Sequence, residues 1–334
     1  MPRFLIPVEG LQLQSPWRVG PVVLQDPLSV EVLVRSRLDL SPGPRAGFHQ
    51  ETFDLLRRWS AAEVDAYDLD GAVGVVRDVL DLLRVFQQTR SNGDPPTFGL
   101  PGDVRLTHLR YLRLDATGGV GFSHTGGVIG ADFPDGEREH WVAARFAEAA
   151  ELVGCADLSP GPAQLMLGVR LLSQAVLEPR PPMRLLATVI ATETLLGRGK
   201  MYQLARRAAF LTCGRPEGNL CGRARPACPF LTLDPTNERD RGRLKTREIQ
   251  ARADPGARCS EWLDFVGRYD DRSGIAHGEP GRDVPEQDAD SDLHWATHWL
   301  LPAALPWLLD HRGDAVGDLD IAISQLPAAD LGNS

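Results

Sequence analysis

The sequence predicts an α+β protein in which a mixed α/β domain, residues 1–135, precedes an all-α helical bundle, residues 136–312. Three observations lead to this prediction. At 334 residues the chain is longer than one typical domain of about 100–150 residues. Short runs rich in β-branched residues, bounded by Gly and Pro, occur before residue 135, and from Glu137 onward the apolar residues recur with a helical period.

The amino-terminal segment contains the pattern of strands around one helix. Phe4 to Leu13 and Trp17 to Leu24 are apolar or alternating runs, which predicts a pair of strands. Ala62 to Tyr67 is a third candidate, and Leu69 to Gln88 carries apolar residues at helical spacing, so a strand is expected to lead into an amphipathic helix. The run from Ser91 to Pro96 must end that helix.

Further strands are expected before the helical part begins. Arg110 to Asp115 and Gly119 to His124 predict two strands of an antiparallel pair, with a glycine-rich hairpin turn between them. Gly126 to Phe133 is a candidate for another strand. We therefore expect the amino-terminal domain to be a small mixed structure suited to sensing or regulation.

The remainder of the chain reads as helices joined mostly by short loops, which is typical of an up-and-down bundle. One long interruption, residues 213–254, is rich in cysteine and arginine, and residues 313–334 are expected to form a poorly anchored tail. The segments with an apolar stripe of helical period are Glu139 to Val153, Pro162 to Leu177, Met183 to Leu196, Met201 to Thr212, Cys259 to His277 and Asp288 to Leu309.

Composition excludes several classes of protein. The longest apolar stretch, Trp299 to Leu309, is short and broken by Pro302 and Pro306, so no membrane span is expected. The amino terminus lacks the pattern of a secretory signal, which predicts a cytoplasmic location. Five cysteines in that compartment are expected to be thiols or metal ligands rather than disulfides.

The charge pattern limits the way in which the chain can bind nucleic acid. A net charge of −9 argues against a protein that coats nucleic acid non-specifically. Basic residues nevertheless concentrate between Arg198 and Arg258, and nearly all of them are arginine. An RNA-binding groove would have to be built from that segment.

The stretch from Tyr269 to Gly278 holds the residues best suited to chemistry. It places Arg272 and His277 five residues apart, next to a glycine. Histidine can move a proton from a ribose 2′-OH near neutral pH. A guanidinium that donates two hydrogen bonds can stabilise the charge that gathers on the phosphate during attack. Together these groups suffice to cut RNA without a metal ion.

This stretch, Tyr-x-x-Arg-Ser-x-Ile-x-His-Gly, resembles the Arg-x4-6-His signature of the HEPN superfamily (higher eukaryotes and prokaryotes nucleotide-binding), in the form found in its ApeA-like branch. Ala191 to Gly197 resembles the end of the first core helix of that branch, and Leu204 to Leu211 resembles the next helix. The resemblance covers about residues 160–310. It implies an all-α bundle, a homodimer and a metal-independent endoribonuclease used in toxin, abortive-infection or phage-defence systems.

The resemblance implies that Arg272 stabilises the phosphorane and that His277 is the general base or acid. A different interpretation pairs Arg272 with Asp270 or Asp271 on a helix surface and lets His277 cap the helix end. On a regular helix, residues five apart lie about 140° from one another around the axis. Either local distortion brings the two side chains together or a second protomer completes the site, and a dimeric family favours the second possibility.

Four other residues are expected to support the site. Ser273 can orient the phosphate but cannot act as a second general base, and Tyr269 either packs or touches RNA. Glu193 is an acid on an otherwise apolar helix and needs a partner, for which Arg207 and Arg272 are the natural residues. We expect a structural or site-orienting salt bridge there.

The cysteine-rich interruption raises the question of a structural zinc ion, although catalysis itself is expected to need no cofactor. Cys213, Cys221 and Cys228 lie next to Gly and Pro residues, and Cys259 would supply a fourth ligand for a tetrahedral site. The spacing lacks any Cys-x-x-Cys knuckle, so free thiols in a loop are the other interpretation. The same loop would instead shape substrate entry through Arg215, Arg223 and Arg225.

These observations and the resemblance predict an ApeA-like endoribonuclease that acts on RNA. The resemblance implies a homodimer, and we expect a protein trigger to act through the amino-terminal domain. The products of cleavage would carry a 2′,3′-cyclic phosphate and a 5′-hydroxyl, because the ribose hydroxyl is the nucleophile. The rival interpretation is a catalytically inactive HEPN dimerisation or interaction module, in which the same residues hold a dimer or dock a partner.

Overall fold

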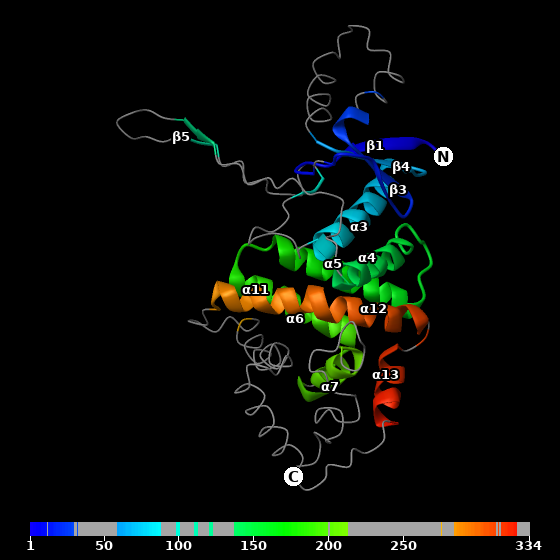
Figure 1. The fold of residues 1–334 in the computed structure, drawn as a ribbon, viewed down its shortest axis with the longest axis vertical. Coiled ribbons are helices and arrows are strands. Elements are labelled where there is room, and N and C mark those ends of the chain that lie inside the picture. Colours follow the sequence, from blue (N-terminus) through cyan, green and yellow to red (C-terminus); the bar gives the residue numbers. More distant parts are fainter. Residues whose placement is uncertain are drawn as a thin grey trace. The chain divides into compact units, whose positions relative to one another are not determined.

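The computed structural model describes residues 1–11, 13–29, 32, 59–87, 98–100, 110–112, 120–122, 137–199, 201–212, 275, 284–311, 313 and 315–325 (Figure 1). The fold is α+β, with a small four-stranded antiparallel sheet and otherwise mostly helices. It divides into two compact units, one of Met1–Pro134 with Ala147–Gly154 and the other of Asp135–Phe146 with Cys155–Ser334. Within the described ranges, no helix is long and apolar enough to cross a membrane.

The sheet of the first unit has the order β1-β4-β3-β2, and every neighbouring pair is antiparallel. Its strands are β1 Arg3–Pro7, β2 Trp17–Val19, β3 Val22–Gln25 and β4 Ala61–Asp65. The predicted strands are therefore present, with one correction. The run from Trp17 to Leu24 forms two strands rather than one, because the Gly20-Pro21 dipeptide makes a two-residue hairpin turn.

The helix α3, Leu69–Gln87, packs against this sheet through β4, β1 and β3. It begins where the Asp68 side chain accepts a hydrogen bond from Gly71 N at 2.7 Å, as an N-cap residue does. Its apolar stripe is fully buried, which confirms the helix that the spacing of these residues predicts. The stripe consists of Val76, Val79, Leu80, Leu83 and Phe86.

Two short strands form a separate hairpin. β5, Arg110–Leu112, pairs with β6, Val120–Phe122, in an antiparallel register that places Arg110 opposite Phe122. The antiparallel pair predicted here is confirmed. The further strand predicted from Gly126 to Phe133 lies outside the described residues.

The helices predicted after residue 137 are present wherever the structure describes the chain. Their bounds are α4 Glu137–Ala150, α5 Pro160–Leu177, α6 Pro181–Leu196, α7 Met201–Thr212, α11 Glu286–Trp295 and α12 Leu301–Asp310. Helix α4 runs across the boundary between the two units. Of the helix predicted from Cys259 to His277, Ile275 alone is described, and it is helical.

In the second unit, helix α6 packs against both α5 and α11, and α12 packs on α5. The apolar residues of these helices form one core. Its fully buried members include Leu165, Val169 and Leu172 of α5, Leu185 and Val189 of α6, and Leu293 and Leu305 of the last helices. Burial of such side chains is the main favourable term in folding, at about 1.5–3 kcal/mol for each.

The long helix predicted from Asp288 to Leu309 is continuous but not regular. Between α11 and α12, residues Ala296–Leu300 form a π-helical segment, η3, and Leu301 N donates to the carbonyl of Ala296, five residues earlier. Pro302 at the start of α12 and Pro306 inside it both lack a backbone donor. A wider turn is one way for a helix to accommodate such a loss.

The poorly anchored tail predicted after Arg312 is wrong for residues 315–324. These residues form the helix α13, Ala315–Ser324. Ala315, Leu319 and Ile323 are buried at a spacing of four residues, which places them on one face of the helix. Trp307 of α12 also donates its indole N–H to the carbonyl of Ala315 at 2.8 Å. Apolar burial and this bond hold α13 against the bundle.

Candidate functional site

The residues expected to perform catalysis fall in a part of the chain that the structure does not describe. Tyr269, Arg272, Ser273 and His277 all lie outside the described residues. The proposed zinc ligands also lie outside them, namely Cys213, Cys221, Cys228 and Cys259. Two of the predicted supporting residues, Glu193 on α6 and Arg207 on α7, can be placed.

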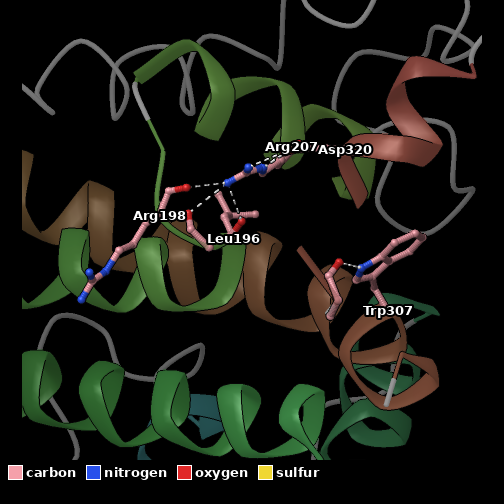
Figure 2. Close-up of polar contacts among 7 residues, drawn as sticks. Leu196, Arg198, Arg207, Trp307 and Asp320 are labelled. Atoms are coloured by element: carbon pink, nitrogen blue, oxygen red, sulfur yellow. Dashed lines mark hydrogen bonds and ion pairs between the residues drawn. The ribbon is translucent and has the colours of Figure 1, made fainter. Parts of the chain in front are cut away.

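Arg207 forms a two-pronged ion pair with Asp320 of α13. Its Nε lies 2.8 Å from Oδ1 of Asp320, and its Nη2 lies 2.6 Å from Oδ2. The arginine side chain is 5% exposed, whereas that of Asp320 is 50% exposed. Figure 2 shows the guanidinium between the end of α6 and α13. This planar, bidentate geometry is the strongest arrangement available to an arginine and a carboxylate.

The third nitrogen of Arg207 faces the carboxyl end of α6. Nη1 donates to the carbonyls of Leu196 and Gly197 at 3.2 Å and to that of Arg198 at 3.0 Å (Figure 2). Carbonyls at a helix end lack partners within the helix and carry partial negative charge. Arg207 therefore supplies a donor to the carbonyls at the end of α6, of which that of Leu196 is buried.

Two partners were expected for Glu193, namely Arg207 and Arg272; Arg207 binds a different carboxylate, and Arg272 lies outside the described residues. Glu193 is half-buried on the last turn of α6, but the carboxylate that Arg207 contacts belongs to Asp320. The reason is the position of α7, which brings the guanidinium to the carbonyls beyond Leu196 rather than back along the helix. All three guanidinium nitrogens of Arg207 therefore have partners.

Sequence reasoning missed Asp320 because it treated the chain after Arg312 as a tail. A signal was present in the spacing of Ala315, Leu319 and Ile323, which recur every four residues as the buried face of a helix does. The pattern has only three members, which is too few to predict a helix from the sequence alone. The pattern becomes informative once Arg207 is known to be buried, because a buried arginine needs a carboxylate and Asp320 lies within this segment.

Aromatic rings pack between α12 and α7. The ring of Trp307 stacks on that of His311, with centroids 3.8 Å apart and planes at 17°, and meets Phe210 of α7 edge-on at 5.8 Å. Trp307 therefore joins α12 to α7 by ring packing and to α13 by its indole hydrogen bond.

Two histidines one turn apart lie at the π-helical segment. The rings of His294 and His298 are 3.9 Å apart at 30° to one another, and His298 is buried. The described residues include no group of three or more His, Cys, Asp or Glu side chains that could hold a metal ion. The contact shown for this pair is that between the two imidazole rings.

Comparison with known proteins leaves the family of this chain undetermined. No protein-family model matches the sequence, and neither a curated protein nor a solved structure matches it. The motif from Tyr269 to Gly278 is accordingly the observation on which a function has to be argued.

Proposed function

We propose that this chain is a metal-independent endoribonuclease of the ApeA-like HEPN type, acting in phage defence, abortive infection or a toxin-like stress response. The observation that carries the proposal is the sequence Tyr-x-x-Arg-Ser-x-Ile-x-His-Gly at residues 269–278. It supplies a proton-transfer group and a fixed cation at the spacing of the family signature. The proposed site needs no other chemical group for RNA cleavage.

The proposed reaction is a transesterification followed by product release. His277 takes the proton of the ribose 2′-OH, the 2′-oxygen attacks the adjacent phosphorus, and the 5′-oxygen leaves as it receives a proton from water. His277 then releases its proton to solvent. Arg272 donates hydrogen bonds to the phosphate oxygens as their charge increases. Ser273 orients the phosphate. The bond broken is P–O5′, so the products end in a 2′,3′-cyclic phosphate and a 5′-hydroxyl.

The described helices support this proposal in a general way. Helix α6 ends at Leu196, and α7 covers residues 204–211, so both segments that resemble the family are helical. A helical bundle places motifs from separate helices on one core. The guanidinium of Arg207 is already bound to Asp320 and to helix carbonyls, so the proposed catalytic site does not include it.

A two-fold dimer is part of the proposal. On a regular helix Arg272 and His277 point in directions about 140° apart, so a second protomer is a natural way to complete the site. Light scattering combined with size-exclusion chromatography is expected to give twice the mass of one chain for the active species. A fully active monomer would rule out the shared site.

The amino-terminal unit is proposed to receive the trigger. It has its own sheet, with a helix packed on it. Deleting it is expected to change the regulation of RNA cleavage and to leave the cleavage chemistry unaltered.

The proposal is tested by incubating the purified protein with total RNA in the presence of EDTA. Wild-type protein is expected to cut RNA, and His277→Ala is expected to lose about 10²–10⁴-fold in rate. Arg272→Lys keeps the charge but loses the planar fork, so it should also be severely impaired. His140→Ala, a histidine of α4 outside the motif, is the matched control.

The results separate the proposed nuclease from its rival. Dimeric protein that never cuts RNA, with or without a trigger, would favour the inactive HEPN interaction module. RNA cleavage that persists after both Arg272 and His277 are replaced would place the activity at an unrelated site.

A further inference from the structure

We infer that α13 is a detachable clasp that keeps the corner between α6 and α7 closed. The corner is defined here as residues Leu196–Gly199, between the end of α6 and the start of α7. The inference comes from the contacts that α13 makes with this corner, and it does not rest on the proposed nuclease activity.

The first contact is electrostatic and joins three elements. Arg207 binds three carbonyls of the corner with Nη1, and binds Asp320 of α13 with Nε and Nη2 (Figure 2). A buried cation that loses its carboxylate is strongly disfavoured. When α13 leaves, the guanidinium must find water, and the carbonyls of the corner then compete with solvent for its remaining donors.

The second contact is steric and lies at Gly197. This residue has φ 78°, a conformation that favours glycine, and an added Cβ would lie 2.3 Å from Cγ2 of Val316. The backbone of the corner therefore passes directly under the first turn of α13. Docking of the helix and closure of the corner are two parts of one packing arrangement.

The size of α13 makes the clasp detachable. Isolated helices shorter than about 12–15 residues are marginal in water. This one has ten residues, and its burial rests on Ala315, Leu319 and Ile323. Asp320, the residue that engages Arg207, remains half-exposed. The helix is therefore expected to form only when docked, and to open without unfolding the core of α5, α6 and α11.

Through Asp320 and Arg207, the docking of α13 affects α7, which lies far earlier in the sequence. Helix α7 leads directly into the arginine- and cysteine-rich residues 213–254. A partner protein that binds α13, or a protease that removes it, would free the corner and change how α7 is held. We therefore assign α13 as a conformational control element.

Limited trypsin digestion of the full chain tests this inference. Arg198 is exposed and is followed by Gly199, so the bond between these two residues is a trypsin site. The carbonyl of Arg198 is held by Arg207, and cleavage of this bond therefore requires the corner to open. Asp320→Asn keeps the shape of the side chain and removes its charge. The initial rate of cleavage after Arg198, followed by mass spectrometry, is expected to rise about tenfold or more, because such cleavage follows the population of the open form.

The matched control is Asp318→Asn, an exposed acid on the same helix for which the structure shows no role in the clasp. Its rate should equal that of the wild type. Equal rates for Asp320→Asn, Asp318→Asn and wild type would overturn the inference.

A second measurement needs no variant. In hydrogen exchange of the wild-type protein, the amides of α13 and of residues 197–199 should exchange together and faster than those of α5. If α13 exchanges only with global unfolding, the helix is not detachable and the inference is wrong.

Discussion

Gly168 of α5 faces the side chain of Leu195 of α6 so closely that an added Cβ would lie 2.5 Å from Cδ2 of the leucine. The missing side chain allows the two helices to approach. A neighbouring bond, from Gln164 Nε2 to the carbonyl of Thr194 at 2.6 Å, fixes them in the same place. This close approach sets the position of the end of α6, to which Arg207 binds.

Gly168→Ala is expected to destabilise the second unit by about 1–3 kcal/mol, because overpacking at the α5–α6 contact outweighs the better helix propensity of alanine. Gly74→Ala is the matched control, since a Cβ there meets nothing within 4 Å. That change in a helix interior should be stabilising by about 0.5–1 kcal/mol. Urea unfolding measures both. The same sign for the two substitutions would contradict this account of the contact.

Asp26 is expected to make a pH-dependent contribution to the free energy of unfolding of the first unit. Burial alone would raise its pKa, but hydrogen bonds from the Ser29 hydroxyl and from the amides of Ser29 and Leu28 outweigh burial and hold the pKa below its ordinary value of 3.8. A lowered pKa in the folded state stabilises the protein above the unfolded pKa. That stability is lost as pH falls through the folded pKa.

Asp26→Ala is therefore expected to cost about 1 kcal/mol at neutral pH, in the manner of a lost capping residue. The difference from wild type should narrow when unfolding is measured below pH of about 4. Asp157→Ala, at an exposed acid, serves as the control substitution. A difference for Asp26→Ala that stays constant from pH 7 to pH 3 would be inconsistent with a lowered pKa.

Elements that depend on local pattern are predictable from this sequence. The stripe of α3 and those of α5 to α7 repeat over several turns, so the helices were expected close to their actual bounds. The hairpin at Gly20-Pro21 and the π-helical segment before Pro302 were not expected. Each depends on how one residue changes the backbone inside a run that otherwise looks regular.

Partners that depend on tertiary structure are harder to predict. Arg207 was expected, as one of two alternatives with Arg272, to pair with Glu193, fourteen residues before Arg207. The carboxylate that Arg207 contacts is that of Asp320, 113 residues after it. Nothing local to Arg207 indicates that distant residue. The motif residues Arg272 and His277 lie outside the described chain, so their arrangement stays a prediction.

Zinc in the cysteine-rich residues 213–259 would be structural. If it is bound, protein prepared without chelators should contain about one zinc ion per chain and should lose thermal stability on chelation, because the binding energy of a structural zinc is folding energy. Elemental analysis settles the metal content. Absence of metal would leave Cys213, Cys221, Cys228 and Cys259 as thiols. RNA cleavage is not expected to respond to chelation unless the protein unfolds.

The chemical ends of the cleaved RNA test the central claim most directly. Wild-type protein in EDTA should produce a 2′,3′-cyclic phosphate and a 5′-hydroxyl from a defined RNA. The same RNA with one 2′-deoxyribose at the cleaved position should bind but resist cutting, because it lacks the nucleophile and keeps the phosphate. Products ending in a 3′-hydroxyl, cutting of DNA at a comparable rate, or wild-type activity in His277→Ala would contradict the proposed mechanism.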